Sequence, residues 1–582
     1  MAGPRPVPFL DQMRKLIPLS LALLTLTAAL AQAQPAIATN GVLNASSGLP
    51  DVARGSWFIV TGTGLGPASI SVQNAPPYSA TLSGTGITFT PAGGGAPVSA
   101  LMYYTMATQV AGLLPSSTPA GVYNVTVTYN QRTSAPATVN VVEHNFGFAT
   151  QTSNGQGPAQ ATYNGYDLNR FTTGSIGQWS LRPAKPGDVM VLWGTGLGAD
   201  PASDINGGSS GDQTASAQVS VLVSGIAVTP AYAGRSNEPG LDQINFTVPT
   251  TVTPSCFASL QVSAGGRLSN LGSIAVAADG TACTSPALTQ AQLHTLDMGG
   301  TLTAGGLQIG KSSMIYTSSV SENTDAAAAW FGKYSVDAVA NSNLAVVQPG
   351  ACFLVHRAGT ADQLGFGLPP AQTLDAGAQL TLNGPNASNM ALPRQSGDTY
   401  FATLYSTGIA GVGAVGTSPI LTAGTYTMAG TGGADVGAFS TSIALPGDFA
   451  WTNEGSIANP IPRNTPLAVT WTGNAGGLVV ILGAALTRTA GTGIGSTYSA
   501  LGFNCVAQAS ANSFTVPANI LQQLPAVSGS ATNSTFGMLS VFAVPDMSKG
   551  QGTFTVPLTA GDTLDVGVLG YEVAFNKIVG FN

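Results

Sequence analysis

The most recognisable chemical pattern in the sequence is a pair of GTGLG segments, Gly62–Gly66 and Gly194–Gly198. The second, completed by Ala199, satisfies the G-x-G-x-x-G/A fingerprint of dinucleotide-binding units. That chemistry needs a helix beginning at the glycines, because its free N–H groups hold the pyrophosphate. The residues after Ala199 lack helical periodicity, and the first copy has Pro67 at the last position. We therefore predict no nucleotide cofactor, and expect the glycines to supply positive φ angles or close backbone packing at a strand end.

Hydrolytic chemistry would need an acid and a base that the fold brings together. A glycosidase requires two carboxylates roughly 5 to 10 Å apart, and the C-terminal half offers four candidates: Asp435, Glu454, Asp565 and Glu572. The three histidines lie in different regions, without neighbours typical of a triad or a metal site: His144, His294 and His356. No G-x-S-x-G segment follows a strand-like run. The sequence therefore predicts no catalytic residue.

One glycine-rich loop carries four oxygen-bearing side chains of the kind that bind calcium: Asp200, Asp204, Asn206 and Asp212. Calcium prefers carboxylate and amide oxygens, but the spacing is not that of an EF-hand. Side chains of this type also cap turns. A loop closed by such turns is the favoured interpretation, with calcium as the alternative.

The four cysteines form two candidate disulfides. Cys256 and Cys283 are close in sequence, and closing their loop would stabilise the fold by roughly 3 to 4 kcal/mol. Cys352 and Cys505 form a possible long-range pair. No C-x-x-C cluster suggests zinc.

Two tryptophans near expected strand ends, Trp451 and Trp471, could present a half-exposed ring to a sugar or a peptide. Core packing is the favoured interpretation for both rings, with the ligand platform as the alternative. Trp57 and Trp193 lie within apolar runs, and we expect them in the core.

The glycine segments belong to a tandem duplication. Gly55–Gly66 aligns with Gly187–Gly198 at an offset of 132, and Gln109–Pro115 aligns with Gln243–Pro249 at an offset of 134. Further on, Arg132 and Ser134 match Arg267 and Ser269 at an offset of 135. Self-similarity at a fixed spacing indicates two copies of one domain. Both copies contain short alternating runs separated by Gly, Pro, Asn and Ser, the pattern of antiparallel sandwiches.

The second copy carries a family resemblance in "KPGDVMVLWGTGLGAD" and in the segment from "VSGIAVTPAYAGR" to "GGRLSN". These residues resemble the immunoglobulin-like repeat of secreted proteins from Solibacter-type acidobacteria, and the repeat is similar in outline to IPT/TIG domains. The resemblance covers roughly residues 35–283. It implies export and an Ig-like fold, and it transfers no catalytic residue.

From these patterns we expect an all-β, multidomain chain. The predicted parts are a signal peptide (1–33), two Ig-like β-sandwiches (35–143 and 144–285) and two β-rich domains (290–446 and 447–582). Two short helices are also expected, over 323–334 and 518–524.

The N-terminal residues predict export. Arg14 and Lys15 precede an apolar stretch that ends at Ala31-Gln32-Ala33, which is typical of a secretory signal peptide cleaved near Ala33. We expect no transmembrane helix in the mature chain, which lacks a long apolar run.

The charge of the chain limits the classes of partner that it could bind. Charged residues make up 7% of the 582 residues and the net charge is −7, whereas about 25% is usual. With no basic run beyond the N-terminus, a nucleic-acid partner is not expected. The sequence therefore favours a secreted or cell-surface, non-catalytic protein for adhesion or recognition of an extracellular protein or glycan. The alternatives are a self-assembling structural surface protein and an extracellular polysaccharide-active enzyme.

Overall fold

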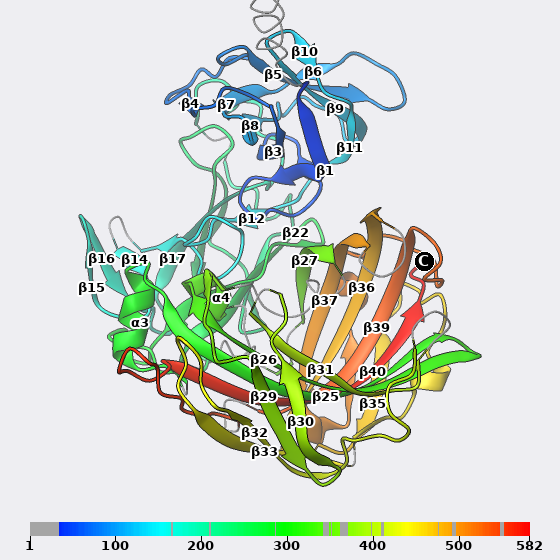
Figure 1. Cartoon of the computed structure of the whole chain (residues 1–582). Coiled ribbons are helices and arrows are strands. Elements are labelled where there is room, and N and C mark those ends of the chain that lie inside the picture. The colour runs from blue at the N-terminus through cyan, green and yellow to red at the C-terminus, as the bar shows by residue number, and fades with distance from the viewer. Residues whose placement is uncertain are drawn as a thin grey trace, which may run out of the picture.

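The computed structural model describes residues 34–163, 167–208, 211–285, 287–340, 349–350, 352–360, 370–396, 398–408, 413–447, 449–474, 476–491, 496–546 and 552–582. The predicted signal peptide lies outside this range. The regular secondary structure of the described residues is almost all β-strand, arranged in seven sheets (Figure 1). The all-β fold of tandem sandwiches is thus confirmed. None of the described helices is long and apolar enough to cross a membrane.

The first sandwich packs two mainly antiparallel sheets around one core, and β2 and β11 are its parallel pair. One sheet has the order β1(Ala36–Asn44)-β3(Trp57–Thr63)-β8(Gln109–Leu113)-β7(Leu101–Thr105)-β4(Ser71–Val72). The other has the order β2(Val52–Ala53)-β11(Ala137–Val142)-β9(Gly121–Tyr129)-β5(Thr85–Pro91)-β6(Val98–Ser99), with β10(Arg132–Thr133) beside β9. Alternate residues of these strands point inward, and Phe58, Val60, Phe89 and Val125 are fully buried between the sheets.

The second sandwich repeats this plan. Its larger sheet has the order β15(Gly174–Ile176)-β16(Trp179–Arg182)-β14(Asp167–Asn169)-β13(Ala161–Thr162)-β17(Val189–Thr195)-β21(Asp242–Thr247)-β20(Tyr232–Arg235), with β12(Gly147–Phe148) beside β17. Its smaller sheet has the order β19(Ile226–Val228)-β18(Ser220–Val223)-β22(Ser255–Ala264)-β23(Arg267–Leu268), with β24(Gly272–Val276) beside β22.

The two sandwiches share their pairing register. In the first, Trp57 pairs with Leu113 and Thr61 with Gln109; in the second, the equivalent pairs are Val189 with Thr247 and Trp193 with Gln243. The matched serines make matched hydrogen bonds. Ser134 Oγ accepts from the Val127 N–H and donates to the Ala135 carbonyl, as Ser269 Oγ does with Val262 and Asn270.

The C-terminal half is built around one nine-stranded sheet. Its order is β27(Cys352–Thr360)-β37(Thr497–Gln508)-β36(Leu478–Ala490)-β39(Thr535–Val544)-β40(Val566–Val579)-β25(Leu302–Thr317)-β26(Val320–Tyr334)-β28(Gln372–Thr373), with β31(Tyr400–Ser406) beside β26. β25 and β40 are neighbouring parallel strands. The expected boundary between 446 and 447 therefore runs through a single sheet, and we describe residues 287–582 as one C-terminal unit.

Two small sheets pack against the nine-stranded sheet. One has the order β30(Ala387–Pro393)-β29(Gln379–Gly384)-β32(Gly424–Gly430)-β33(Phe439–Leu445), and the other has the order β34(Ala450–Trp451)-β35(Leu467–Thr472)-β38(Ser513–Val516). Each small sheet forms a separate core with the large one.

The predicted helix over 323–334 is wrong, because these residues form most of β26. Alanine favours helix, but this segment pairs with β25 on one side and with β31 on the other, so tertiary contacts override the local preference. The helix predicted near 518 exists as α5 (Ala518–Leu521). Two helices were not predicted, α3 (Gln290–Asp297) and α4 (Val336–Ala340).

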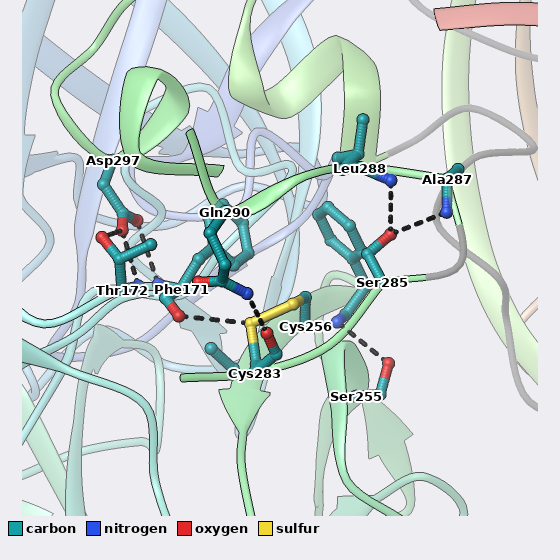
Figure 2. Close-up of a disulfide and its surroundings, with 12 residues drawn as sticks. Phe171, Thr172, Ser255, Cys256, Cys283, Ser285, Ala287, Leu288, Gln290 and Asp297 are labelled. Carbon is teal, nitrogen blue, oxygen red and sulfur yellow. Dashed lines mark hydrogen bonds between the residues drawn. A yellow bond between two sulfur atoms is a disulfide. The ribbon is translucent and has the colours of Figure 1, made fainter. Parts of the chain in front are cut away.

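Both predicted disulfides are formed, Cys256–Cys283 and Cys352–Cys505. Figure 2 shows the first of these, which lies within the second sandwich next to Gln290, near the start of the C-terminal unit. Gln290 Nε2 of α3 donates to the Cys283 carbonyl at 2.6 Å. At the other end of α3, Asp297 accepts from the backbone N–H groups of Phe171 and Thr172 at 3.0 and 2.8 Å. Helix α3 therefore fastens the C-terminal unit to the second sandwich at both of its ends.

Candidate functional site

The GTGLG glycines serve backbone packing, as expected. A Cβ on Gly62 would clash with the Ala36 carbonyl, and one on Gly194 would clash with the Gly147 carbonyl, because β1 and β12 cross close over these positions. Gly196 adopts φ +107°, which L-residues with side chains rarely reach.

The glycine loop of the second sandwich does hold an anion, but the anion is the protein's own Asp242. The Leu197 N–H donates to Asp242 Oδ2 at 2.7 Å, and Arg235 Nη1 lies 2.5 Å from Asp242 Oδ1. Both side chains are almost fully buried. Burial raises the pKa of Asp242 to about 6, although Arg235 and the backbone N–H groups of the loop act in the opposite direction. The fingerprint thus marks a structural carboxylate site.

Arg235 also links the two sandwiches. Its Nη2 donates to the carbonyl of Gly55 in the first sandwich at 2.7 Å and to that of Gly198 in the second at 2.9 Å. A buried guanidinium that spans two domains in this way fixes their relative orientation.

Two of the calcium candidates lie at this junction. Asp204 accepts from both the N–H and the Oγ of Ser116 at 2.7 Å, and the Asp200 N–H donates to Ser116 Oγ at 2.9 Å. Asp212 instead accepts from the backbone N–H groups of Thr214 and Ala233. Asn206 lies on the exposed part of the loop. Across the described ranges, no group of three or more His, Cys, Asp or Glu side chains is placed to hold a metal.

The hypothesis of a surface platform at Trp451 and Trp471 is wrong. The two residues pair across β34 and β35 and are only 5% and 1% exposed. Trp451 Nε1 donates to Asn453 Oδ1, and Trp471 Nε1 donates to the Ala509 carbonyl. Both rings fill the core between the small sheet and the nine-stranded sheet, because β34 and β35 turn these positions inward.

The four carboxylates considered for glycoside hydrolysis have separate surroundings. Asp435 accepts from the Asp375 N–H, Asp565 from Thr303, and Glu572 from Gln308. Glu454 begins a short 3-10 helix, and its carbonyl accepts from Lys577. Among the described contacts, none joins any two of these four carboxylates.

The histidines are equally dispersed. His144 Nδ1 lies 2.6 Å from the Leu197 carbonyl, and His294 Nδ1 lies 3.2 Å from Thr172 Oγ1. His356 is in β27, in a different part of the fold.

The structure instead gathers aromatic side chains on the outer face of the first sandwich. We call the cluster of Trp57, Tyr78, Tyr103 and Tyr104 the aromatic face. The ring centroid of Trp57 lies 5.2 Å from that of Tyr78 and 5.1 Å from that of Tyr103. The ring centroids of Tyr103 and Tyr104 are 5.8 Å apart. Tyr103 is 38% exposed and the other three are half-buried. The prediction that Trp57 lies in the core is wrong, because its position in β3 faces outward.

The composition of this face is unusual for an outer sheet surface, which in antiparallel sandwiches is typically polar. The second sandwich provides the comparison within the same chain. At the positions equivalent to Ala111 and Leu113, beneath the aromatic face, it has Asn245 and Thr247. Trp193 is also half-buried rather than in the core, and its Nε1 donates to Thr162 Oγ1 at 3.0 Å. The two copies thus share their inner faces and differ in their outer ones.

Polar groups border the aromatic face. Tyr104 OH donates to Gln109 Oε1 at 2.8 Å, and Trp57 Nε1 donates to the Pro239 carbonyl of the second sandwich at 2.8 Å. The exposed Glu238 precedes that proline. Burial raises the pKa of the Tyr78 hydroxyl, and the nearby Glu238 carboxylate raises it further. Both sandwiches therefore contribute to the edge of the site.

Sequence reasoning missed this site because its members are far apart in the chain. The available signal was "LMYYT", where two adjacent tyrosines in one strand cannot both face the core. The outward position of Trp57 follows only from the register of β3.

Comparison with known proteins gives only distant similarity to solved structures. No family model and no curated protein matches the chain. Among solved structures, similarity is found to immunoglobulin domains 1–4 of Sidekick-1 (11% identity, TM-score 0.11, 94% of this chain and 99% of that one). Similarity is also found to the FN1-FN3 domains of chicken CNTN1 (11% identity, TM-score 0.12, 71% of this chain and 98% of that one). A third similar structure is an endo-fucoidan hydrolase of glycoside hydrolase family 107 (11% identity, TM-score 0.12, 68% of this chain and 42% of that one). These values transfer no activity, ligand or partner to this chain.

Proposed function

We propose that this chain is an exported, non-catalytic β-sandwich protein that acts in adhesion or recognition at the cell surface or in the surrounding medium. The aromatic face is the observation that carries the proposal. Exposed clusters of Trp and Tyr are typical of binding surfaces, because their rings supply large contact areas at little conformational cost.

Export is supported by chemistry as well as by the N-terminal sequence. Two disulfides use all four cysteines, and such bonds persist in oxidising compartments.

The direct test is binding of the purified, labelled chain to cell envelopes from the organism that produces it. We expect saturable binding that falls strongly in the variant Tyr78→Ala/Tyr103→Ala. Phe401→Ala, which removes an equally exposed ring of β31 outside the aromatic face, should bind like the unmodified chain. Absence of saturable binding would refute the proposal.

Two further measurements separate the alternatives. Release of soluble sugars from the envelopes would indicate a polysaccharide-active enzyme. Concentration-dependent assembly into large particles on size exclusion, unaffected by the double substitution, would indicate a structural protein.

A further inference from the structure

The chemistry of the aromatic face indicates which class of ligand it suits. We propose that it binds a neutral polysaccharide chain, with the rings of Trp57, Tyr78 and Tyr103 against the C–H faces of the sugar units. This inference rests on the recognition function proposed above and names its ligand.

The arrangement of the rings is the first argument. Tyr78 stands nearly perpendicular to both Trp57 and Tyr103, at interplanar angles of 85° and 89°. The rings therefore brace one another and do not collapse into a single stack, and Tyr103 is the most exposed ring of the cluster. A pyranose ring presents an apolar C–H face bordered by hydroxyl groups, which matches an aromatic surface with polar groups beside it.

The polar groups at the edge are the second argument. Among the described residues, the Glu238 carboxylate and the hydroxyls of Tyr78 and Tyr103 make no hydrogen bond, and the residues Glu238 and Tyr103 are exposed. The Gln109 side chain accepts from Tyr104 OH through Oε1, which leaves its amide nitrogen as a donor. These groups can accept hydrogen bonds from sugar hydroxyls and donate hydrogen bonds to them, and each sugar hydroxyl can act in both ways.

Charge is the third argument, because it selects neutral sugars over acidic ones. The ionisable groups that influence the pKa of Tyr78 are Glu238 and Tyr103, and neither is a cation. The two cation–π contacts found among the described residues involve Tyr163 and Tyr498, which lie elsewhere. A uronate or a sulfated sugar would meet the Glu238 carboxylate without a compensating charge.

The position of the face provides the fourth argument. The first sandwich forms one end of the molecule, and its β3-β8-β7-β4 sheet edge is clear of the C-terminal unit (Figure 1). A long chain can therefore pass across the face without meeting the large sheet.

The test uses native affinity electrophoresis of the full chain in gels that contain hydroxyethylcellulose, galactomannan or xylan, with alginate and polygalacturonate as acidic comparisons. We expect at least one neutral polysaccharide to retard the chain. The apparent Kd should rise at least tenfold in Tyr78→Ala/Tyr103→Ala, rise by less in Tyr103→Phe, which keeps the ring but loses the hydroxyl, and be unchanged in Phe401→Ala. Weaker retardation in Glu238→Gln is also expected.

Several outcomes would overturn the inference: no retardation by any neutral polysaccharide, stronger retardation by the acidic ones, or equal retardation of the double variant. Circular dichroism and melting curves of each variant separate loss of binding from loss of folding.

Treatment of the cell envelopes distinguishes this failure from failure of the recognition function. Periodate destroys sugar diols and protease removes proteins. Binding that is lost after periodate supports the inference. Binding that survives periodate but is lost after protease, and still depends on Tyr78 and Tyr103, keeps the recognition function and refutes a polysaccharide ligand.

Discussion

At the scale of single residues, buried charges in this chain are neutralised by neighbours that come from distant segments. Arg235 meets Asp242 and two carbonyls, and Asp297 meets two backbone N–H groups and the hydroxyl of Thr172. Removal of one partner from such a set leaves the other without compensation, which costs far more than the loss of an exposed pair.

Arg235→Met should therefore lower the free energy of unfolding of the second sandwich by about 3 to 5 kcal/mol, since it strands the Asp242 carboxylate and the Gly55 carbonyl. Denaturant unfolding measures this change in free energy, and calorimetry provides a second, independent measurement. The double variant Arg235→Met/Asp242→Leu removes both charges and should recover much of the loss. A double variant less stable than the single one would contradict this account.

Glu572 offers a second test, through pH. Its carboxylate lies on the nine-stranded sheet beside Gln308, and burial raises its pKa. A raised pKa in the folded state means that ionisation disfavours folding, so the contribution is most favourable at low pH and is lost as pH rises through the folded value. Glu572→Gln should be more stable than the unmodified chain at pH 8, by about 1 kcal/mol, and not at pH 4.

The matched control is Asp562→Asn, a carboxylate that is exposed. Because this carboxylate is exposed, Asp562→Asn should not show the gain in stability at pH 8 that we expect of Glu572→Gln. Equal behaviour of the two variants would show that the environment of Glu572 plays no part.

At the scale of elements, the sequence correctly predicted structure that depends on local residue patterns. It failed where the structure of a segment depends on the strands that pair with it. The apolar runs within Trp57–Thr63 and Val189–Thr195 correctly indicated strands, and the glycines correctly indicated close backbone contact. The four alanines of 326–329 favour helix locally, but they lie between two strands. No local pattern could show that β25 would pair with β40, more than 250 residues away.

The candidate site was less predictable than the fold for a related reason. Whether a tryptophan in a strand faces inward depends on the pairing register, because a shift of one residue moves every side chain to the other face of the sheet. Trp471 turned inward and Trp57 outward, and composition does not distinguish them.

Helix α3 is the element whose local signal was present but unused. Thr289 and Gln292 form a capping box, in which each side chain accepts from the other's backbone N–H. Thr289→Ala should cost about 1 kcal/mol, seen as roughly fivefold faster hydrogen exchange in Gln290–Asp297. Thr289→Ser keeps the hydroxyl and should exchange like the unmodified chain, and an equal increase in both variants would argue against the cap.

At the scale of the whole molecule, the junction between the two sandwiches completes the proposed site. Ser116 binds Asp204, and Asp51 pairs with Arg267 at 2.6 Å. Trp57 donates to Pro239 across the same junction. The aromatic face therefore depends on the second sandwich for Glu238 and for the position of Trp57.

This dependence predicts that loosening the junction weakens binding without touching a ring. Spin labels at the exposed positions Thr138 and Ser216 should give one narrow distance distribution in the unmodified chain, because buried polar contacts hold the two sandwiches as a single body. Asp204→Ala/Arg267→Ala should broaden that distribution and reduce envelope binding severalfold, while Arg132→Ala, an exposed cation of the first sandwich, should change neither. A broadened distribution with full binding would show that the first sandwich recognises its ligand alone; a distribution that is already broad in the unmodified chain would show that the junction does not fix the two sandwiches.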